Sequence, residues 1–376
     1  ALPACAVRYS GARYGGIVFG LLLSLSTAWP CAALLTRITE AGALATSDAQ
    51  EVILEQNDDG VITRYRVSYD GDASSFGWLI VTRGHVGEGD VTEADESLFD
   101  DLRTYTAPRL YIEEEVGSSG GGSGCSCMGT DKSSPFLAGS ELSADFGVED
   151  TGSIDITAEG FAGPFSYTAL SATDTDALVT WLDENEFELG DTASSLDHYV
   201  EDGNYTFVAV TLTPDTAATP AEGRVLPALA IQSDAEQMEF PARLSYTGMA
   251  EELRTSIWVL GDNTAETIDG WGSVRLSVLG GGSDPSAAYD QMLRDTSIQD
   301  GRSYATVFSG PHGSQWVTRF DTLAHRSLHS EDPVFGFTPY TESFNVEIYV
   351  NEGYEHSSAW LWLPLFGLGI ARRRRV

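Results

Sequence analysis

The chain has 376 residues, enough for one large or two ordinary domains, and 42% of them are hydrophobic, which argues against disorder of the whole chain. Its 56 acidic residues outnumber 21 basic ones, and the formal net charge is −35 at pH 7. A surface this negative repels phosphate backbones, so we expect no direct binding of nucleic acid. Lys132 is the only lysine, and an acid-rich, lysine-poor surface suits saline surroundings.

Residues 1–28 are predicted to be a secretory signal peptide. Arg8 and Arg13 supply its positive region, an apolar stretch begins at Ile17, and the small residues 26–28 suit signal peptidase. The apolar stretch is short for a membrane span, although an uncleaved N-terminal anchor remains the alternative. We therefore expect the protein to be exported.

The first half of the body, residues 29–116, is predicted to be β-rich. Asn57-Asp58-Asp59-Gly60 is a strong hairpin signal because Asp-Gly readily takes the positive φ that such turns need. The remaining pattern predicts strands at 50–56, 61–69, 76–81 and 109–115, with a helix at 96–106.

Residues 117–135 form a Gly/Ser-rich loop that contains Cys125 and Cys127. Residues 117–121 match G-x-S-x-G, but the strand and helix that a nucleophile elbow requires are not predicted around them. Cys31 is the third cysteine outside the leader, so one disulfide among the three is possible. Too few further Cys or His residues lie near for a zinc site.

The second half, residues 136–350, is predicted to combine strands with a few helices. Helices are expected after Asp174 or Thr175 as N-cap, near 195–200 and at 287–294. Strands are expected at 153–159, 165–172, 205–213, 225–232, 238–246, 255–260 and 315–320. The whole body therefore reads as α+β with mainly antiparallel sheets.

Residues 357–376 are predicted to be a hydrophobic tail with an arginine stop. An apolar run from 359 to 371, with Trp360 and Trp362 near its outer edge, precedes Arg372, Arg373, Arg374 and Arg375. The run is shorter than the roughly 20 residues of a spanning helix, as in C-terminal sorting tails that a protease clips. We expect the membrane, the export machinery and a tail-processing machinery as partners. The location would be the periplasm or the cell surface, membrane-tethered unless the tail is clipped.

Several short motifs occur in a consistent order along the body. They are Phe76-Gly77-Trp78-Leu79-Ile80, Leu98-Phe99-Asp100-Asp101-Leu102, the Cys-x-Cys loop, Asp176-Ala177-Leu178-Val179-Thr180-Trp181-Leu182, Phe207-Val208-Ala209-Val210, Phe240-Pro241-Ala242-Arg243-Leu244, Val317-Thr318-Arg319 and Glu331-Asp332-Pro333-Val334-Phe335. Together they resemble the bacterial exported family called domain of unknown function 2330. The resemblance implies a secreted or envelope-anchored protein without an assigned activity, and it supplies no catalytic residue.

No catalytic, cofactor-binding or metal-binding residue is predicted from local motifs. His325 and His329 have zincin spacing without the intervening glutamate, and His85 and His198 read as isolated surface or capping histidines. The loop acids Asp70, Asp72, Asp174 and Asp176 could bind structural calcium weakly.

The preferred hypothesis is a non-enzymatic interaction or structural domain tethered to the envelope, with a protein or glycan partner. A secreted hydrolase with a dispersed active site and a sugar- or peptide-binding module are the alternatives. A pocket that joins a carboxylate to a histidine with shifted pKa values would favour the hydrolase. An open aromatic groove would favour binding, and a flat acidic surface a structural role.

Overall fold

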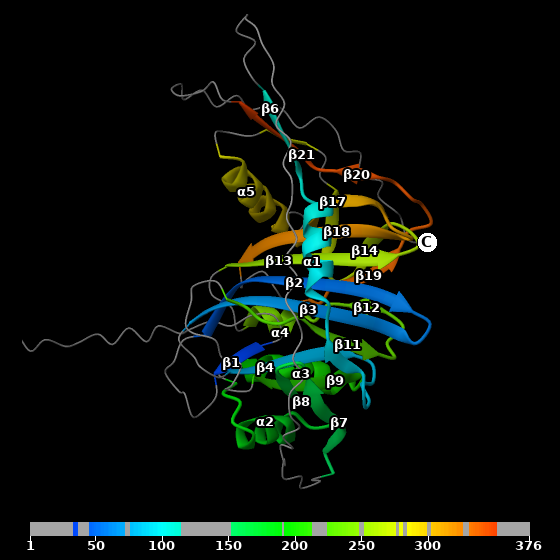
Figure 1. Cartoon of the computed structure of the whole chain (residues 1–376). Coiled ribbons are helices and arrows are strands. Elements are labelled where there is room, and N and C mark those ends of the chain that lie inside the picture. The colour runs from blue at the N-terminus through cyan, green and yellow to red at the C-terminus, as the bar shows by residue number, and fades with distance from the viewer. Residues whose placement is uncertain are drawn as a thin grey trace, which may run out of the picture.

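Two β-sheets packed face to face form the centre of the molecule, with helices on both outer faces (Figure 1). The computed structural model describes residues 33–36, 45–71, 76–113, 152–189, 192–212, 224–247, 252–275, 278–280, 284–298, 302–325 and 331–351. The predicted leader, the Cys-x-Cys loop and the hydrophobic tail lie outside these residues.

The larger sheet has ten strands in the order β15-β17-β18-β13-β2-β3-β11-β5, with β10 beside β3 and β20 beside β17. Its strands are β2 (Ala45–Asn57), β3 (Gly60–Gly71), β5 (Val91–Glu93), β10 (Arg224–Val225), β11 (Leu229–Ser233), β13 (Glu252–Gly261), β15 (Gly272–Arg275), β17 (Ser303–His312), β18 (Gln315–His325) and β20 (Phe344–Asn345).

The smaller sheet has five strands in the order β1-β4-β9-β8-β7, all antiparallel. They are β1 (Ala33–Thr36), β4 (Phe76–Arg83), β7 (Ile154–Ala162), β8 (Phe165–Ala172) and β9 (Tyr205–Leu212). Both sheets combine strands from before and after residues 117–135.

Two three-stranded sheets complete the β structure. One is ordered β12-β19-β14 and the other β16-β21-β6. Their strands are β6 (Arg109–Glu113), β12 (Met238–Glu239), β14 (Ala265–Asp269), β16 (Val278–Gly280), β19 (Val334–Phe337) and β21 (Glu347–Asn351). Four strand pairings in the described residues are parallel and the others antiparallel, which confirms the predicted fold class.

Strand alternation divides the core into layers. Val52 and Leu54 of β2 pack with Trp78 and Ile80 of β4 between the two sheets, whereas Ile53 points to the opposite face of the large sheet. This period of two is what a strand buried on both faces requires. The sequence from 52 to 54 is consequently apolar on both sides.

Five helices cover the outer faces of the sheets within the described part of the chain. They are α1 (Glu96–Tyr105), α2 (Thr175–Glu184), α3 (Ala193–Asp202), α4 (Ala242–Thr247) and α5 (Pro285–Ser297). Phe99 and Leu102 of α1 pack on the large sheet, as does Leu293 of α5. The small sheet packs against α2 and α3 through Leu178 and Leu196. No helix of the described residues is long and apolar enough to cross a membrane.

Most of the predicted local signals are confirmed. Gly60 has φ +129° in the predicted hairpin, and the Asp174 side chain accepts a hydrogen bond from the backbone N of Ala177 as the N-cap of α2. The predicted strand at 238–246 is wrong, because only β12 is extended and α4 follows it. Pro241 explains the difference: it donates no backbone hydrogen bond and its fixed φ suits the start of a helix.

Candidate polar ligand site

A polar basin, which we call the Asp332 basin, lies where α3 meets the ends of several strands. Its volume is about 400 Å³. The carboxylates among its lining residues are Asp202, Glu239, Asp269, Glu331 and Asp332, and its basic side chains are Arg83, Arg243 and His198. Apart from these and Tyr205, its large side chains are Gln237 and Val334.

Strand pairing brings together Glu239 and Asp332, the two most buried of the acids that line the basin. Glu239 of β12 pairs with Val334 of β19, which follows Asp332 by two residues. Val334 also pairs with Asp269 of β14 on its other side. The three-stranded sheet β12-β19-β14 therefore sets these acids around one opening, although they are far apart in the sequence.

Asp332 forms the floor of the basin and is only 8% exposed. Its Oδ1 accepts hydrogen bonds from the backbone N of Arg243 at 2.8 Å and from the hydroxyl of Tyr199 at 3.3 Å. The backbone N–H of Arg243 lies in the first turn of α4, where N–H groups have no carbonyl acceptor within the helix. Two donors therefore hold Oδ1 of Asp332 in place.

The other oxygen of Asp332 is left without a hydrogen bond. Oδ2 lies 3.4 Å from Nε of Arg243 and 3.7 Å from Nε2 of His198, but it accepts no hydrogen bond from any described residue. Arg243 Nε is also buried, and it too makes no hydrogen bond within the described part of the chain. The acceptor Asp332 Oδ2 and the donor Arg243 Nε thus lie side by side. Leaving a buried donor or acceptor without a hydrogen bond costs free energy of folding.

Burial shapes the titration of this group. It raises the pKa of Asp332 to about 7, although the hydrogen bond from Arg243 acts in the opposite direction. Burial and the neighbouring charge of Arg243 lower the pKa of His198. Near neutral pH the carboxyl is therefore partly protonated beside a largely neutral imidazole, and the pair can both donate and accept a proton.

Glu239, in contrast, is fully engaged by the protein. Its carboxylate lies 2.9 Å from Nη1 of Arg83 and accepts a hydrogen bond of 2.5 Å from the hydroxyl of Tyr205. Burial and the charge of Glu239 raise the pKa of Tyr205 well above its ordinary value, so Tyr205 keeps the proton that it donates. Glu239, Arg83 and Tyr205 thus bond to one another in the lining of the basin, whereas Asp332 Oδ2 and Arg243 Nε keep hydrogen-bonding capacity that no described residue uses.

The residues singled out from the sequence lie elsewhere or outside the described residues. Cys31, Cys125 and Cys127, the four arginines of the tail and Trp360 and Trp362 are all outside them. His325 is the last residue of strand β18 and His329 is not described, so no helical His pair is found within the described ranges.

Calcium binding stays a prediction. No group of three or more His, Cys, Asp or Glu side chains in the described ranges is arranged to hold a metal ion. Of the four loop acids proposed, Asp174 uses its carboxylate as a helix cap, and Asp72 lies outside these ranges.

Sequence reasoning missed the basin because its members come from separate elements. The sequence predicts His198 to be an isolated surface or capping histidine, and 41% of its side chain is exposed in the structure. A signal was nevertheless present, since Arg243 and Asp332 each stand in one of the motifs that carried the family resemblance. The order of the motifs along the chain could not reveal that Arg243 and Asp332 form an ion pair in the fold.

Comparison with known proteins gives a family but no activity. No curated protein matches the chain. Among solved structures it is similar to the crystal structure of baculovirus P35, with 8% identity, a TM-score of 0.33 and coverage of 83% of this chain and 99% of that one, a likeness too weak to carry over fold or function. A family model described as an uncharacterised protein conserved in bacteria matches residues 28–305. The chain therefore belongs to this family, domain of unknown function 2330, as its motif order had indicated.

Proposed function

We propose that this protein is an exported, envelope-associated binding protein that holds a sugar in the Asp332 basin without catalysing a reaction. The observation that carries this proposal is the buried pair formed by Asp332 Oδ2 and Arg243 Nε, which lie 3.4 Å apart without a hydrogen bond between them. A sugar hydroxyl both donates and accepts hydrogen bonds, so one such group can satisfy both atoms at once.

The lining of the basin favours a sugar over a peptide. Two common modes of peptide recognition use apolar pockets for side chains or a free strand edge for the backbone. Val334 is the only aliphatic side chain among the described residues that line the basin, and its strand β19 is already paired on both sides. Closely spaced acids, arginines and a histidine instead match a ligand covered with hydroxyl groups.

A hydrolase is the second candidate, and the shifted pKa of Asp332 is the observation that favours it. A carboxyl group that is protonated near pH 7 could act as a general acid on a glycosidic oxygen, with a second carboxylate such as Glu239 opposite it. The described lining residues include no Ser, Thr or Cys, so an acyl-enzyme mechanism has no nucleophile among them. Binding is preferred because Glu239 is already held by Arg83 and Tyr205.

The test is a binding screen of the full chain against neutral mono- and oligosaccharides, followed by calorimetry on any that bind. The Arg243→Gln variant should bind at least tenfold more weakly, because it loses the charged donor beside Asp332. Asp101→Asn is the matched control, since Asp101 is exposed on α1 outside the basin. Equal affinity of Arg243→Gln and the unmodified chain would contradict the assigned site.

The same incubations separate binding from hydrolysis. Recovery of the intact oligosaccharide after prolonged contact with the protein supports a binding role. New reducing ends that disappear in Asp332→Asn would establish the hydrolase instead.

The proposed location rests on the sequence of the two ends. Positively charged and apolar residues within 1–28 favour export, and the arginine-stopped run within 357–376 favours tethering to the membrane. Expression in a Gram-negative host should yield a mature chain that begins at Trp29, as read by mass spectrometry of its N-terminal peptide. A chain that keeps residues 1–28 would mean an uncleaved anchor.

A further inference from the structure

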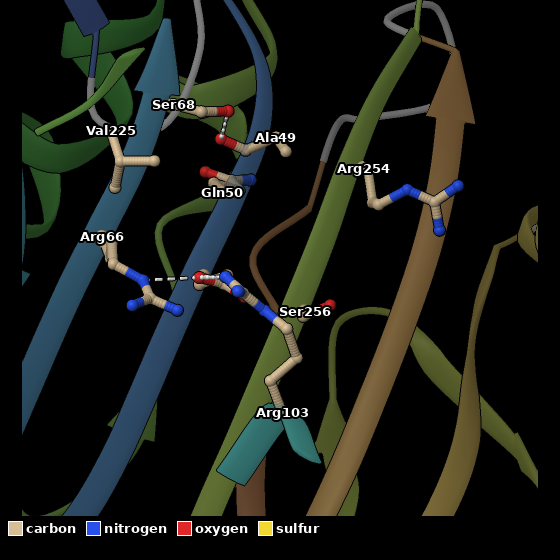
Figure 2. Close-up of a pocket in the computed structure, with 9 residues that line it drawn as sticks. Ala49, Gln50, Arg66, Ser68, Arg103, Val225, Arg254 and Ser256 are labelled. Carbon is tan, nitrogen blue, oxygen red and sulfur yellow. Dashed lines mark hydrogen bonds and ion pairs between the residues drawn. The ribbon is translucent and has the colours of Figure 1, made fainter. Parts of the chain in front are cut away.

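A second hollow, which we call the arginine cavity, lies on the face of the large sheet that carries α1 and α5. Its volume is about 210 Å³, and Figure 2 shows the side chains that line it. Three arginines from three different elements line it: Arg66 of β3, Arg103 of α1 and Arg254 of β13. Such a cluster of positive charge is unexpected in a chain whose formal net charge is −35.

Strand register explains why a hollow forms here. One row across the sheet runs Val225, Ser68, Ala49 and Arg254, and the next runs Arg66, Glu51 and Ser256. The side chains in the middle of the first row, Ser68 and Ala49, are small, whereas Glu51 in the middle of the second row is larger. The helices on this face approach from opposite sides, since Arg103 of α1 bonds to Glu51 and Asp290 of α5 bonds to Arg254. Small side chains beneath the gap between two helices leave space that the arginines border.

Each arginine has a carboxylate partner, but the partners do not use all of the donors. Arg66 directs Nε to Glu51 at 2.7 Å and Nη1 to Asp100 at 2.9 Å. Its Nη2 is buried and makes no hydrogen bond to any described residue. The guanidinium cannot lose its proton, so this donor stays in place at every physiological pH.

The side chains that line the cavity carry more positive than negative charge. Glu51 is the only acid among the described lining residues, and Arg103 holds it through two hydrogen bonds of 2.8 Å and 2.7 Å. Asp100 and Asp290 neutralise the arginines from outside the cavity. Ser68 and Ser256 add hydroxyl groups to the same lining. Guanidinium groups with hydroxyls are the donor set that binds carboxylate, sulfate and phosphate oxygens.

We propose that the arginine cavity is a binding site for one small oxyanion, either a free ion or an anionic substituent of a larger molecule, held by Arg66, Arg103 and Arg254. The bound oxygen accepts a hydrogen bond from the unused Nη2 donor of Arg66, and Arg254 closes the site from the side of α5. This site is independent of the Asp332 basin, with which it shares no described lining residue.

The test is equilibrium dialysis of the full chain with radiolabelled inorganic sulfate, with sodium chloride holding the ionic strength constant. The expected result is saturable binding of one sulfate per chain. Arg254→Gln should weaken sulfate binding at least tenfold. Arg103→Gln should weaken it as well, and this second variant serves as the test if Arg254→Gln folds poorly. Circular dichroism establishes that each variant is folded.

Arg275→Gln is the matched control, because Arg275 is an exposed arginine that pairs with Glu342 at 2.7 Å outside the cavity. It should bind sulfate within about twofold of the unmodified chain. A sugar sulfate monoester added as a competitor distinguishes the sources: stronger competition than inorganic sulfate indicates a substituent, and equal competition indicates the free ion. No saturable sulfate binding, or equal loss in Arg254→Gln and Arg275→Gln, would overturn the proposal.

Discussion

Replacing Asp332 with asparagine should make the folded protein more stable above pH 7 and leave its stability almost unchanged near pH 3. Burial raises the pKa of this carboxyl from 3.8 to about 7 on folding. Between these values the folded state binds a proton that the unfolded chain has released, so stability falls as the pH rises. The contribution of the protonated group is complete below pH 3.8 and is lost as the pH approaches 7.

The size of this effect follows from the shift. Each pH unit of displacement corresponds to about 1.4 kcal/mol, so the buried charge costs up to roughly 4 kcal/mol above pH 7. Asparagine keeps the acceptor that bonds to the backbone N of Arg243 and removes the charge. The Asp332→Asn variant should therefore be more stable than the unmodified chain by roughly 2–4 kcal/mol at pH 8.

Denaturant unfolding at fixed ionic strength, repeated between pH 3 and pH 8, measures this difference directly. The groups around Asp332 that also titrate or carry charge include Tyr199, Tyr205, His198, Arg243 and Glu239, and all of them remain in the variant. Asp101→Asn, which alters an exposed helix residue, should change stability by less than about 0.5 kcal/mol at pH 8. A loss of stability in Asp332→Asn at pH 8 would mean that Arg243 and His198 outweigh the burial of the charge.

A gain of stability in this variant would also bear on function. A carboxylate kept at a cost to stability, with one oxygen unused, is typical of a site that evolution retains for a ligand. A sugar hydroxyl that donates to Oδ2 stabilises the ionised form, so saturating ligand should reduce the stability gap between the two proteins above pH 7.

Local signals in the sequence were sufficient for much of the fold. The turn at Gly60 and the N-cap at Asp174 were readable because both depend on residues adjacent in the chain. The strand predicted at 238–246 is wrong because alternating apolar residues there resemble a strand, whereas only two residues are extended and α4 begins directly after Pro241. Parallel pairing of β2 with β13, about 200 residues apart, left no local trace at all.

The Asp332 basin shows the same limit for function. The sequence offers many carboxylates, and nothing local distinguishes Asp332 from the solvated ones. Its properties arise from burial against Tyr199 and from the start of α4, two elements that reach it through tertiary packing. Motif order located the family, but only the folded arrangement identifies which acid has unused hydrogen-bonding capacity.

The second large effect should come from Gly270, which lies beside Asp332 in the wall of the basin. Gly270 has φ +70°, a conformation that costs other residues about 1 kcal/mol or more. A Cβ atom at this position would also overlap the backbone carbonyl of Asp332, well inside van der Waals contact. Gly270→Ala should therefore destabilise the protein by roughly 3–4 kcal/mol. This figure adds the backbone strain at residue 270 to the cost of displacing the backbone at Asp332.

Gly313→Ala is the matched control because it separates the two causes. Gly313 has a similar φ of +62°, but no atom of the described residues lies within 4 Å of the position its Cβ would occupy. Its alanine variant should lose only the strain, about 1 kcal/mol, and should keep its affinity for the basin's ligand. Gly270→Ala should in addition lose ligand affinity, because Oδ2 of Asp332 can no longer stay beside Nε of Arg243. Denaturant unfolding measures both losses. If the two variants lose the same stability, displacing the backbone at Asp332 costs no free energy, which would contradict the predicted effect of the overlap at Gly270.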